Sequence, residues 1–115
     1  MKICYLDAFS GISGDMLVGA LADAGADQTA LTSALESLCA GAKARFETTS
    51  RAGIRATRFH VEPGQGQPAH RHLPEILALI EAAALPARAR ENAGKVFRRL
   101  GEVEAAVHQV PLEEV

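Results

Sequence analysis

The segment Ile3–Met16 reads ICYLDAFSGISGDM and decides how the chain begins to fold. Its first part, Ile3–Leu6, is a continuous apolar run that includes isoleucine and tyrosine, and such a run predicts a buried strand. Gly11 and Gly14 then predict a tight turn, and the residues from Met16 onward have helical spacing. We therefore expect a strand, a glycine-rich turn and a helix in succession.

Two helices joined by a short break are expected next. Gly25 supplies the stop for the first helix, whose apolar face consists of Met16, Leu17, Ala20, Leu21 and Ala24. Asp27 is a suitable N-cap for the second helix, and Gly41 ends it. The apolar positions of the second helix also recur at helical spacing; they are Leu31, Ala34, Leu35 and Leu38. The pattern predicts a helical hairpin.

Polar and apolar residues alternate on both sides of Gly53, over Ala44–Thr49 and Thr57–Val61. This alternation predicts an antiparallel β-hairpin with one apolar and one charged face. We expect the loop between the strands to be longer than two residues.

Two further helices follow the Gly- and Pro-rich loop Glu62–His72. The first is predicted over Leu73–Ala84, with Pro74 in its first turn. Pro86 opens the second, whose predicted apolar stripe is Val96, Phe97, Leu100, Val103 and Val107. The fold class is therefore α+β, with an N-terminal strand-turn-helix, a helical hairpin, an antiparallel β-hairpin and then two helices, in a single domain over residues 1–115.

The composition is that of an ordinary globular domain, with 48% hydrophobic residues among 115 and a formal net charge of −2. Basic residues show no excess and no run, so we expect no nucleic-acid partner. The N-terminus does not resemble a signal peptide, and we expect no membrane association. Cys4 and Cys39 are predicted to be buried free thiols, which fits a cytoplasmic protein.

The opening turn is the first candidate site. Unpaired backbone N–H groups at a helix N-terminus suit an anion such as phosphate, and glycines let a ligand approach the backbone closely. Asp7 ends the predicted strand and Asp15 lies in the first helical turn, so a divalent cation would have to bridge these carboxylates to a phosphate. The alternative is that Ser10 or Ser13 caps the helix while Asp15 only complements its dipole.

His70 and His72 form the second candidate site. Both imidazoles could reach one metal ion from an extended backbone, and imidazole suits nickel, zinc or copper. Two ligands make an incomplete metal site, and the alternative is a solvated polar loop. The spacing around Ser13 does not match a nucleophile elbow, which excludes a serine hydrolase of that type.

The stretch YLDAFSGISGDMLVGALADAG is similar to the opening of the nickel-insertion proteins of the lactate racemase maturation system, the LarC-type family. Three later stretches agree. SRAGIRATRFHVE resembles the hairpin of this family, and HRHLPEILALIEAAALPARARENAGKVFRRLGEVEAAVH resembles its histidine-then-helix-pair region. VHQVPLEEV resembles the stretch before a His-x-His-Glu element. The resemblance covers nearly the whole chain and implies the N-terminal portion of a longer protein, whose C-terminal portion would be a partner of this one.

The resemblance implies a nickel chelatase of the lyase class. Such a protein inserts nickel into pyridinium-3,5-bisthiocarboxylic acid mononucleotide and consumes CTP with the help of manganese or magnesium, which yields the nickel-pincer cofactor of lactate racemase. It further implies Asp7 and Asp15 as catalytic residues and cation ligands, with nickel contacts at His70 and His72. The implied phosphate cradle consists of Ser10, Gly11, Ser13 and Gly14.

Two other classes of function stay open. One is a nucleotide- or metal-binding module without catalysis of its own, and the other is a structural or oligomerisation domain. The sequence does not set the oligomeric state, so a homo-oligomer is compatible with it.

Overall fold

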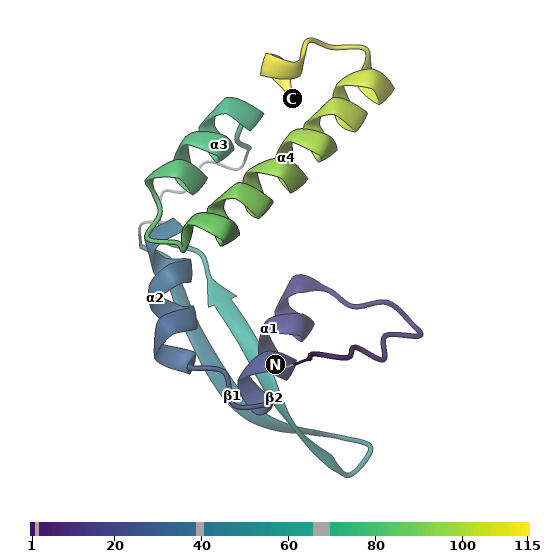
Figure 1. Ribbon diagram of the computed structural model, residues 1–115, viewed down its shortest axis with the longest axis vertical. Helices are drawn as coiled ribbons and strands as arrows, with labels where there is room; N and C mark the ends of the chain where they lie inside the picture. The colour runs from purple at the N-terminus through teal and green to yellow at the C-terminus, as the bar shows by residue number, and fades with distance from the viewer. Residues whose placement is uncertain (2, 39–40, 66–69) are drawn as a thin grey trace.

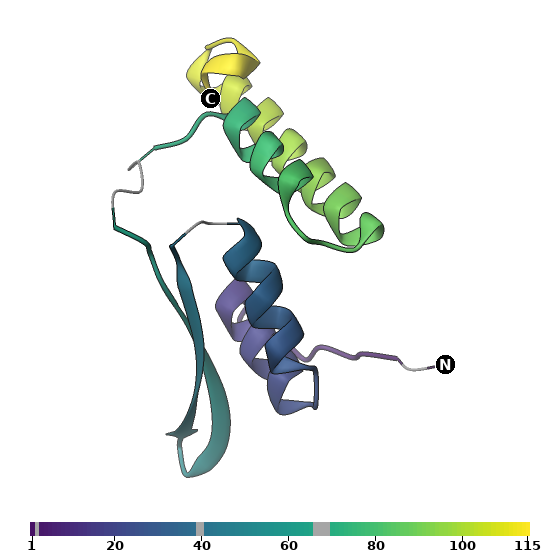
Figure 2. The ribbon, with the colours of Figure 1, turned by 90° about the vertical axis from the view of Figure 1, so that its left-hand side faces the viewer.

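The structure is a computed structural model that describes residues 1, 3–38, 41–65 and 70–115. Two helices and a β-hairpin form one half of the molecule, and a helix pair with a short C-terminal turn forms the other (Figures 1 and 2). The elements are α1 (Gly14–Asp23), α2 (Gln28–Leu38), β1 (Lys43–Arg51), β2 (Ile54–Glu62), α3 (Leu73–Ala82), α4 (Ala87–His108) and the 3₁₀ turn η1 (Leu112–Glu114). The predicted α+β class and the order of its helices and hairpin are confirmed.

The β-hairpin is longer than predicted and its turn is tighter. Strands β1 and β2 pair antiparallel with Phe46 opposite Phe59, whose ring centroids are 5.1 Å apart. Ala52 and Gly53 both have positive φ, at 49° and 78°, so the connection is a two-residue type I′ turn whose twist matches that of the strands. The expected longer loop is wrong because the residues on either side of this turn already pair as strand.

Helix α1 packs on β2 through small residues. Gly19 and Ala22 are its buried positions, and a Cβ atom on Gly19 would lie only 2.5 Å from the carbonyl oxygen of Thr57. Gly25 ends α1 as predicted, in the left-handed conformation with φ of +100°. The contact between Gly19 and the backbone of β2 therefore fixes how closely α1 approaches the hairpin.

Helix α2 begins at the predicted N-cap. The Asp27 carboxylate accepts hydrogen bonds from the backbone N–H groups of Thr29 and Ala30, at 2.9 and 3.2 Å. These bonds satisfy two of the donors that a helix N-terminus leaves free. The predicted apolar stripe of this helix is half-buried.

Helices α3 and α4 pack through a different face of α4 than predicted. The buried positions on α4 are Gly94 and Gly101, and a Cβ atom on Gly101 would lie 2.6 Å from Leu73 Cδ2. Phe97 is half-buried, but the rest of the predicted stripe is exposed, namely Val96, Leu100, Val103 and Val107. The prediction is wrong because Leu73 of α3 lies so close to α4 at Gly101 that a larger side chain there would clash. The face of α4 with the larger side chains therefore points away from α3.

The predicted strand Ile3–Leu6 does not form. Residues 3–12, here called the N-terminal arm, contain no strand and run away from the rest of the molecule (Figure 2). Ile3 is 80% exposed, Tyr5 86% and Phe9 94%. Cys4 is exposed as well, which contradicts the buried thiol expected there, while Cys39 lies outside the described residues. A strand needs a neighbouring strand for its hydrogen bonds, and within the described residues the sheet consists of β1 and β2.

The chain buries little of its surface. Its accessible area is 8795 Å², whereas a compact protein of this mass would expose about 6,000 Å². The radius of gyration is 16.2 Å, against about 13 Å for a compact domain of this length. Over the described ranges, the buried hydrophobic residues are Ala22, Phe59, Leu73, Ile80 and Ala83. None of the helices in these ranges has both the length and the apolar character required to cross a bilayer.

Candidate functional site

A groove of about 760 Å³ separates helix α1 from the turn end of the β-hairpin. The α1 side of the groove consists of Ser13, Asp15, Met16, Ala20 and Asp23. The hairpin side consists of Thr49, Arg51, Arg55, Ala56, Thr57 and Arg58. The start of α1 is thus held against a group of three arginines that are distant from it in sequence.

The first turn of α1 stabilises the charged form of its acidic side chain, Asp15. Ser13 is the N-cap residue, but its side chain makes no cap hydrogen bond; its hydroxyl donates to Asp15 Oδ1 instead. This bond, together with the backbone N–H of Met16 and the positive charge of Arg58, lowers the pKa of Asp15 below its ordinary value. The predicted alternative of a serine cap is wrong for Ser13, because its hydroxyl donates to the carboxylate of Asp15 and makes no cap hydrogen bond.

At the other end of the groove, Asp23 connects α1 to β2. Its Oδ1 atom accepts a hydrogen bond of 2.7 Å from the Thr57 hydroxyl and lies 3.7 Å from Nη2 of Arg55. Asp23 therefore partly neutralises Arg55 and helps to hold the helix on the hairpin.

The other two arginines of the groove are not engaged in this way. Among the residues that the structure describes, Arg51 and Arg58 form no ion pair with a carboxylate. The groove holds three guanidinium groups and two carboxylates, so it carries a net positive charge. Guanidinium groups recognise phosphate and carboxylate through paired hydrogen bonds, and the groove can therefore bind an anion.

Substitution of Ser13 by alanine should raise the pKa of Asp15 toward its ordinary value, because the hydroxyl that stabilises the carboxylate is the largest cause of the lowering. An NMR titration of the Asp15 side-chain carbonyl carbon measures this shift. Ser10→Ala is the matched control, since Ser10 does not line the groove. An unchanged Asp15 midpoint in Ser13→Ala would contradict the hydrogen bond.

The groove contains two of the residues predicted for the opening turn. Ser13 of the predicted phosphate cradle lines it, whereas Ser10, Gly11 and Gly14 do not. Of the two predicted cation ligands, Asp15 lines the groove and Asp7 does not. Gly11 does lie in the predicted turn, with φ of +83° and its N–H donating to the carbonyl oxygen of Ala8 at 2.9 Å. Asp7 is an exposed residue of the N-terminal arm, because the strand that was expected to place it beside the turn does not form.

The arginines of the groove were not among the predicted site residues. Their only sequence signal is the presence of Arg51, Arg55 and Arg58 within eight residues around the Gly53 turn. Such a cluster is usually a solvated hairpin tip. It becomes part of a site here only because α1 packs against β2.

His72 is the N-cap residue of α3, and His70 precedes it by two residues. Both therefore belong to the half of the molecule that contains α3 and α4, as labelled in Figure 1. His72 Nδ1 donates to the carbonyl oxygen of Glu114 at 3.1 Å, and the next backbone N–H, that of Leu73, donates to Val115 at 2.6 Å. The structure therefore does not bring His70 and His72 together with Asp15. Within the described ranges, no three His, Cys, Asp or Glu side chains are grouped closely enough to hold a metal ion.

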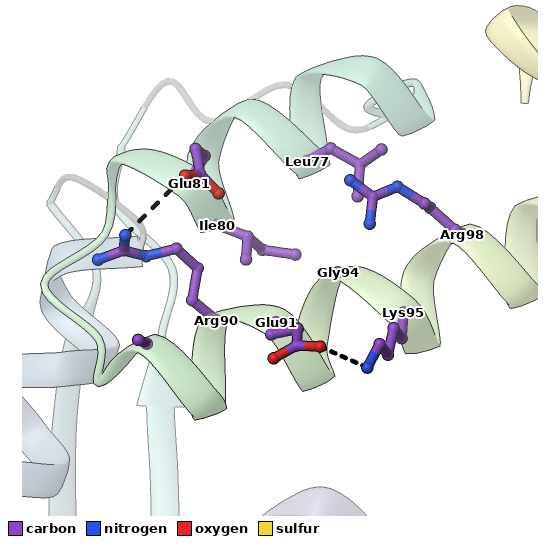
Figure 3. Close-up of a pocket in the computed structure, with 9 residues that line it drawn as sticks. Leu77, Ile80, Glu81, Arg90, Glu91, Gly94, Lys95 and Arg98 are labelled. Atoms are coloured by element: carbon purple, nitrogen blue, oxygen red, sulfur yellow. Dashed lines mark hydrogen bonds and ion pairs between the residues drawn. The ribbon is translucent and has the colours of Figure 1, made fainter.

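A second hollow, of about 490 Å³, lies between α3 and α4 (Figure 3). Its charged side chains largely pair with one another. Arg90 contacts Glu81 at 3.9 Å and donates to the carbonyl oxygen of Leu85 at 3.2 Å, while Lys95 pairs with Glu91. None of the predicted site residues lines this hollow, so the groove beside α1 is the better candidate.

Residues 4–115 match the family described as nickel insertion protein. The pyridinium-3,5-bisthiocarboxylic acid mononucleotide nickel insertion protein of Desulfitobacterium hafniense (strain DCB-2) is 44% identical over all of this chain. The protein of the same name from Geobacillus kaustophilus is 40% identical, again over the whole chain. The chain spans 29% and 30% of the length of these two relatives, and no solved structure matches it. The chain thus belongs to the nickel insertion protein family.

Proposed function

We propose that this chain is the N-terminal part of a nickel chelatase, and that its groove binds the phosphate of the pyridinium mononucleotide into which nickel is inserted. The names of the D. hafniense and G. kaustophilus relatives support the reaction and the substrate. The observation that carries the role of the groove is the presence of Arg51 and Arg58, without a carboxylate partner among the described residues, beside the start of α1.

The charges of the groove match those of a phosphate ester. A phosphate monoester carries between one and two negative charges near neutral pH, and the guanidinium groups of Arg51 and Arg58 can neutralise them. Asp15 alone would repel such a ligand. Its carboxylate and the Ser13 hydroxyl are oxygen donors, which suit a hard cation that also takes phosphate oxygens and water as ligands. Manganese or magnesium would supply the charge that joins Asp15 to the phosphate.

The proposed role of this chain is to bind and orient the nucleotide. The described residues do not bring together a complete set of nickel ligands, so further groups of a longer polypeptide would complete the reaction. Consumption of CTP, membership of the lyase class and a cytoplasmic location remain predictions. CTP is the second phosphate ligand to test in the groove.

Substitution of Asp15 by asparagine should abolish the effect of manganese on nucleotide binding. Asparagine keeps the shape of the side chain and an acceptor for Ser13, but it removes the charge that attracts the cation. With manganese present, we expect binding of the mononucleotide to weaken at least tenfold, while without the metal it should stay equal or tighten. Calorimetric titration of the mononucleotide and, separately, of CTP measures both effects.

Asp7→Asn is the matched control for this experiment, because Asp7 lies outside the groove. We expect it to bind the mononucleotide as the unmodified chain does. Equal binding by Asp15→Asn and the unmodified chain in manganese would contradict the proposal for the groove. If Asp15→Asn weakens the binding of CTP but not that of the mononucleotide, the groove is assigned to CTP rather than to the mononucleotide.

We further propose that His70 and His72 form a contact for nickel before insertion. The Nδ1 hydrogen bond of His72 to Glu114 fixes the ring and leaves Nε2 free to bind a metal ion. In the double variant His70→Ala, His72→Ala, we expect the affinity for Ni²⁺ to fall at least tenfold. His108→Ala is the control, because His108 belongs to α4 and pairs with Glu104. Unchanged nickel affinity in the double variant would exclude the two histidines from the site.

A further inference from the structure

The N-terminal arm exposes a continuous group of large apolar side chains. Its members are Ile3, Tyr5, Leu6, Phe9 and Ile12, and Met16 at the start of α1 extends the group. Isolated apolar residues are common on protein surfaces, but adjacent ones in such number mark a surface that another protein segment covers.

The apolar pattern of the arm is that of a strand buried on both faces. In an extended chain, Ile3 and Tyr5 point to one side and Cys4 and Leu6 to the other. All four are exposed, and their backbone groups take part in none of the strand pairing of the described residues. An apolar residue at every position is typical of strands that lie inside a covered sheet, whereas strands with one wet face alternate.

The β-hairpin of this chain cannot supply that environment. One of its faces is packed by α1 and α2. The other carries charged side chains that pair across the strands, with Arg45 3.1 Å from Glu62 and His60 2.9 Å from Glu47. A strand added beside them would place one of its apolar faces on this charged, solvated surface.

A second copy of the chain does not supply it either. A second copy would offer the same arm and the same hairpin. Two arms paired with each other would form backbone hydrogen bonds along one edge of each arm, but both apolar faces of the pair would stay in water. The relatives, by contrast, contain more than twice as much additional polypeptide, since the match covers 29–30% of their length.

We propose that Ile3–Leu6, the first part of the N-terminal arm, becomes a strand in a β-sheet formed by the part of the nickel insertion polypeptide that lies outside residues 1–115. The surface area agrees with this assignment. The chain exposes about 2,800 Å² more than a compact protein of its mass. A large, permanent interface buries about 2,000–5,000 Å² summed over both partners, so the excess on this chain is sufficient to form one. The inference rests on family membership and on the arm, and it does not depend on which ligand the groove binds.

Pairing of the arm would also affect the groove. The arm ends in the turn at Gly11, and Ser13 and Asp15 follow this turn directly. When the arm is held in a sheet, the start of α1 is held from both sides, by the arm and by the contact of Gly19 with β2. Pairing of the arm would therefore order the acidic end of the groove.

The test uses a chimera in which this chain is continued by the part of the D. hafniense relative that follows the matched segment. Hydrogen exchange of the arm amides is measured by mass spectrometry in the chimera and in the 115-residue chain. We expect exchange at residues 3–6 to be at least about a hundredfold slower in the chimera, with the β1 and β2 amides as an internal reference for folding. Equally fast exchange in both proteins would overturn the proposal. Slow exchange in the 115-residue chain that depends on its concentration would also overturn it, in favour of a second copy.

A substitution provides a second readout. Tyr5→Asp should lower the melting temperature of the chimera clearly and leave that of the 115-residue chain unchanged, because Tyr5 is solvent-exposed only in the latter. Ile54→Asp is the matched control, since Ile54 is a similarly exposed apolar residue at the hairpin turn, and it should change neither protein much. An equal effect of Tyr5→Asp and Ile54→Asp in the chimera would count against burial of the arm.

Discussion

Replacement of Gly19 by alanine should destabilise the chain by about 1–3 kcal/mol, which is the usual range for an extra carbon in a packed contact. The added Cβ atom would lie 2.5 Å from the carbonyl oxygen of Thr57 and 3.6 Å from the backbone nitrogen of Phe59. The nearest of these atoms belongs to the backbone of a paired strand, so it cannot rotate away, and α1 must shift outward from β2. The clash outweighs the gain of up to about 1 kcal/mol in helix propensity from glycine to alanine.

Gly94→Ala is the matched control, because it makes the same chemical change within a helix. Its Cβ atom would meet only the end of the flexible Arg98 side chain, at 3.3 Å, so we expect unchanged or slightly higher stability. Urea denaturation of the two variants measures the difference. If Gly19→Ala is as stable as Gly94→Ala, the close contact of α1 with β2 is wrong. The shift of α1 should also weaken phosphate binding, since it moves Asp15 away from Arg58.

The local signals in the sequence predicted the parts of the fold that local interactions determine. The carboxylate of Asp27 caps α2 through backbone groups two and three residues away, and Gly25 ends α1 because it tolerates a positive φ. Both can be predicted without knowledge of the rest of the molecule. The tight hairpin turn was missed because Ala52 adopts a left-handed conformation that alanine rarely takes.

The errors concern features that depend on distant partners. Residues Ile3–Leu6 have the composition of a buried strand, but a strand also requires a neighbour, and the described residues offer none. On α4, the larger side chains predicted the contact face, yet Gly101 is the residue that lets Leu73 of α3 come close. In both cases the pattern indicates that a surface is to be covered and does not indicate which segment covers it.

The candidate site shows the same division. Ser13 and Asp15 could be predicted because the turn and the start of the helix are contiguous in sequence. Arg51, Arg55 and Arg58 could not, because their role depends on the packing of α1 against a hairpin that follows it by some thirty residues. Sequence alone therefore suggested Ser13 and Asp15 and missed Asp23 and the three arginines of the groove.

Replacement of Arg58 by glutamine should weaken binding of the pyridinium mononucleotide by tenfold or more, because a hydrogen bond to a charged group contributes about 1.5–3 kcal/mol. Arg58 faces the start of α1 across the groove, and its positive charge contributes to the lowered pKa of Asp15. The pKa of Asp15 should therefore rise in the same variant, though by less than in Ser13→Ala, because the charge of Arg58 is the smallest of the causes of the lowering; an NMR titration detects this independently of any ligand. Both readouts follow from the removal of one charge.

Arg45→Gln is the matched control for Arg58→Gln. Arg45 lies on the same hairpin, but it pairs with Glu62 at 3.1 Å and does not line the groove. It should leave both the affinity for the mononucleotide and the pKa of Asp15 unchanged. The variant Arg58→Lys separates the effect of charge from that of geometry, since lysine keeps the positive charge but lacks the planar fork of the guanidinium group. In this variant we expect the pKa of Asp15 to stay closer to that of the unmodified chain than the affinity for the mononucleotide does. Equal loss of binding in Arg45→Gln and Arg58→Gln would show that the ligand responds to overall charge rather than to this groove.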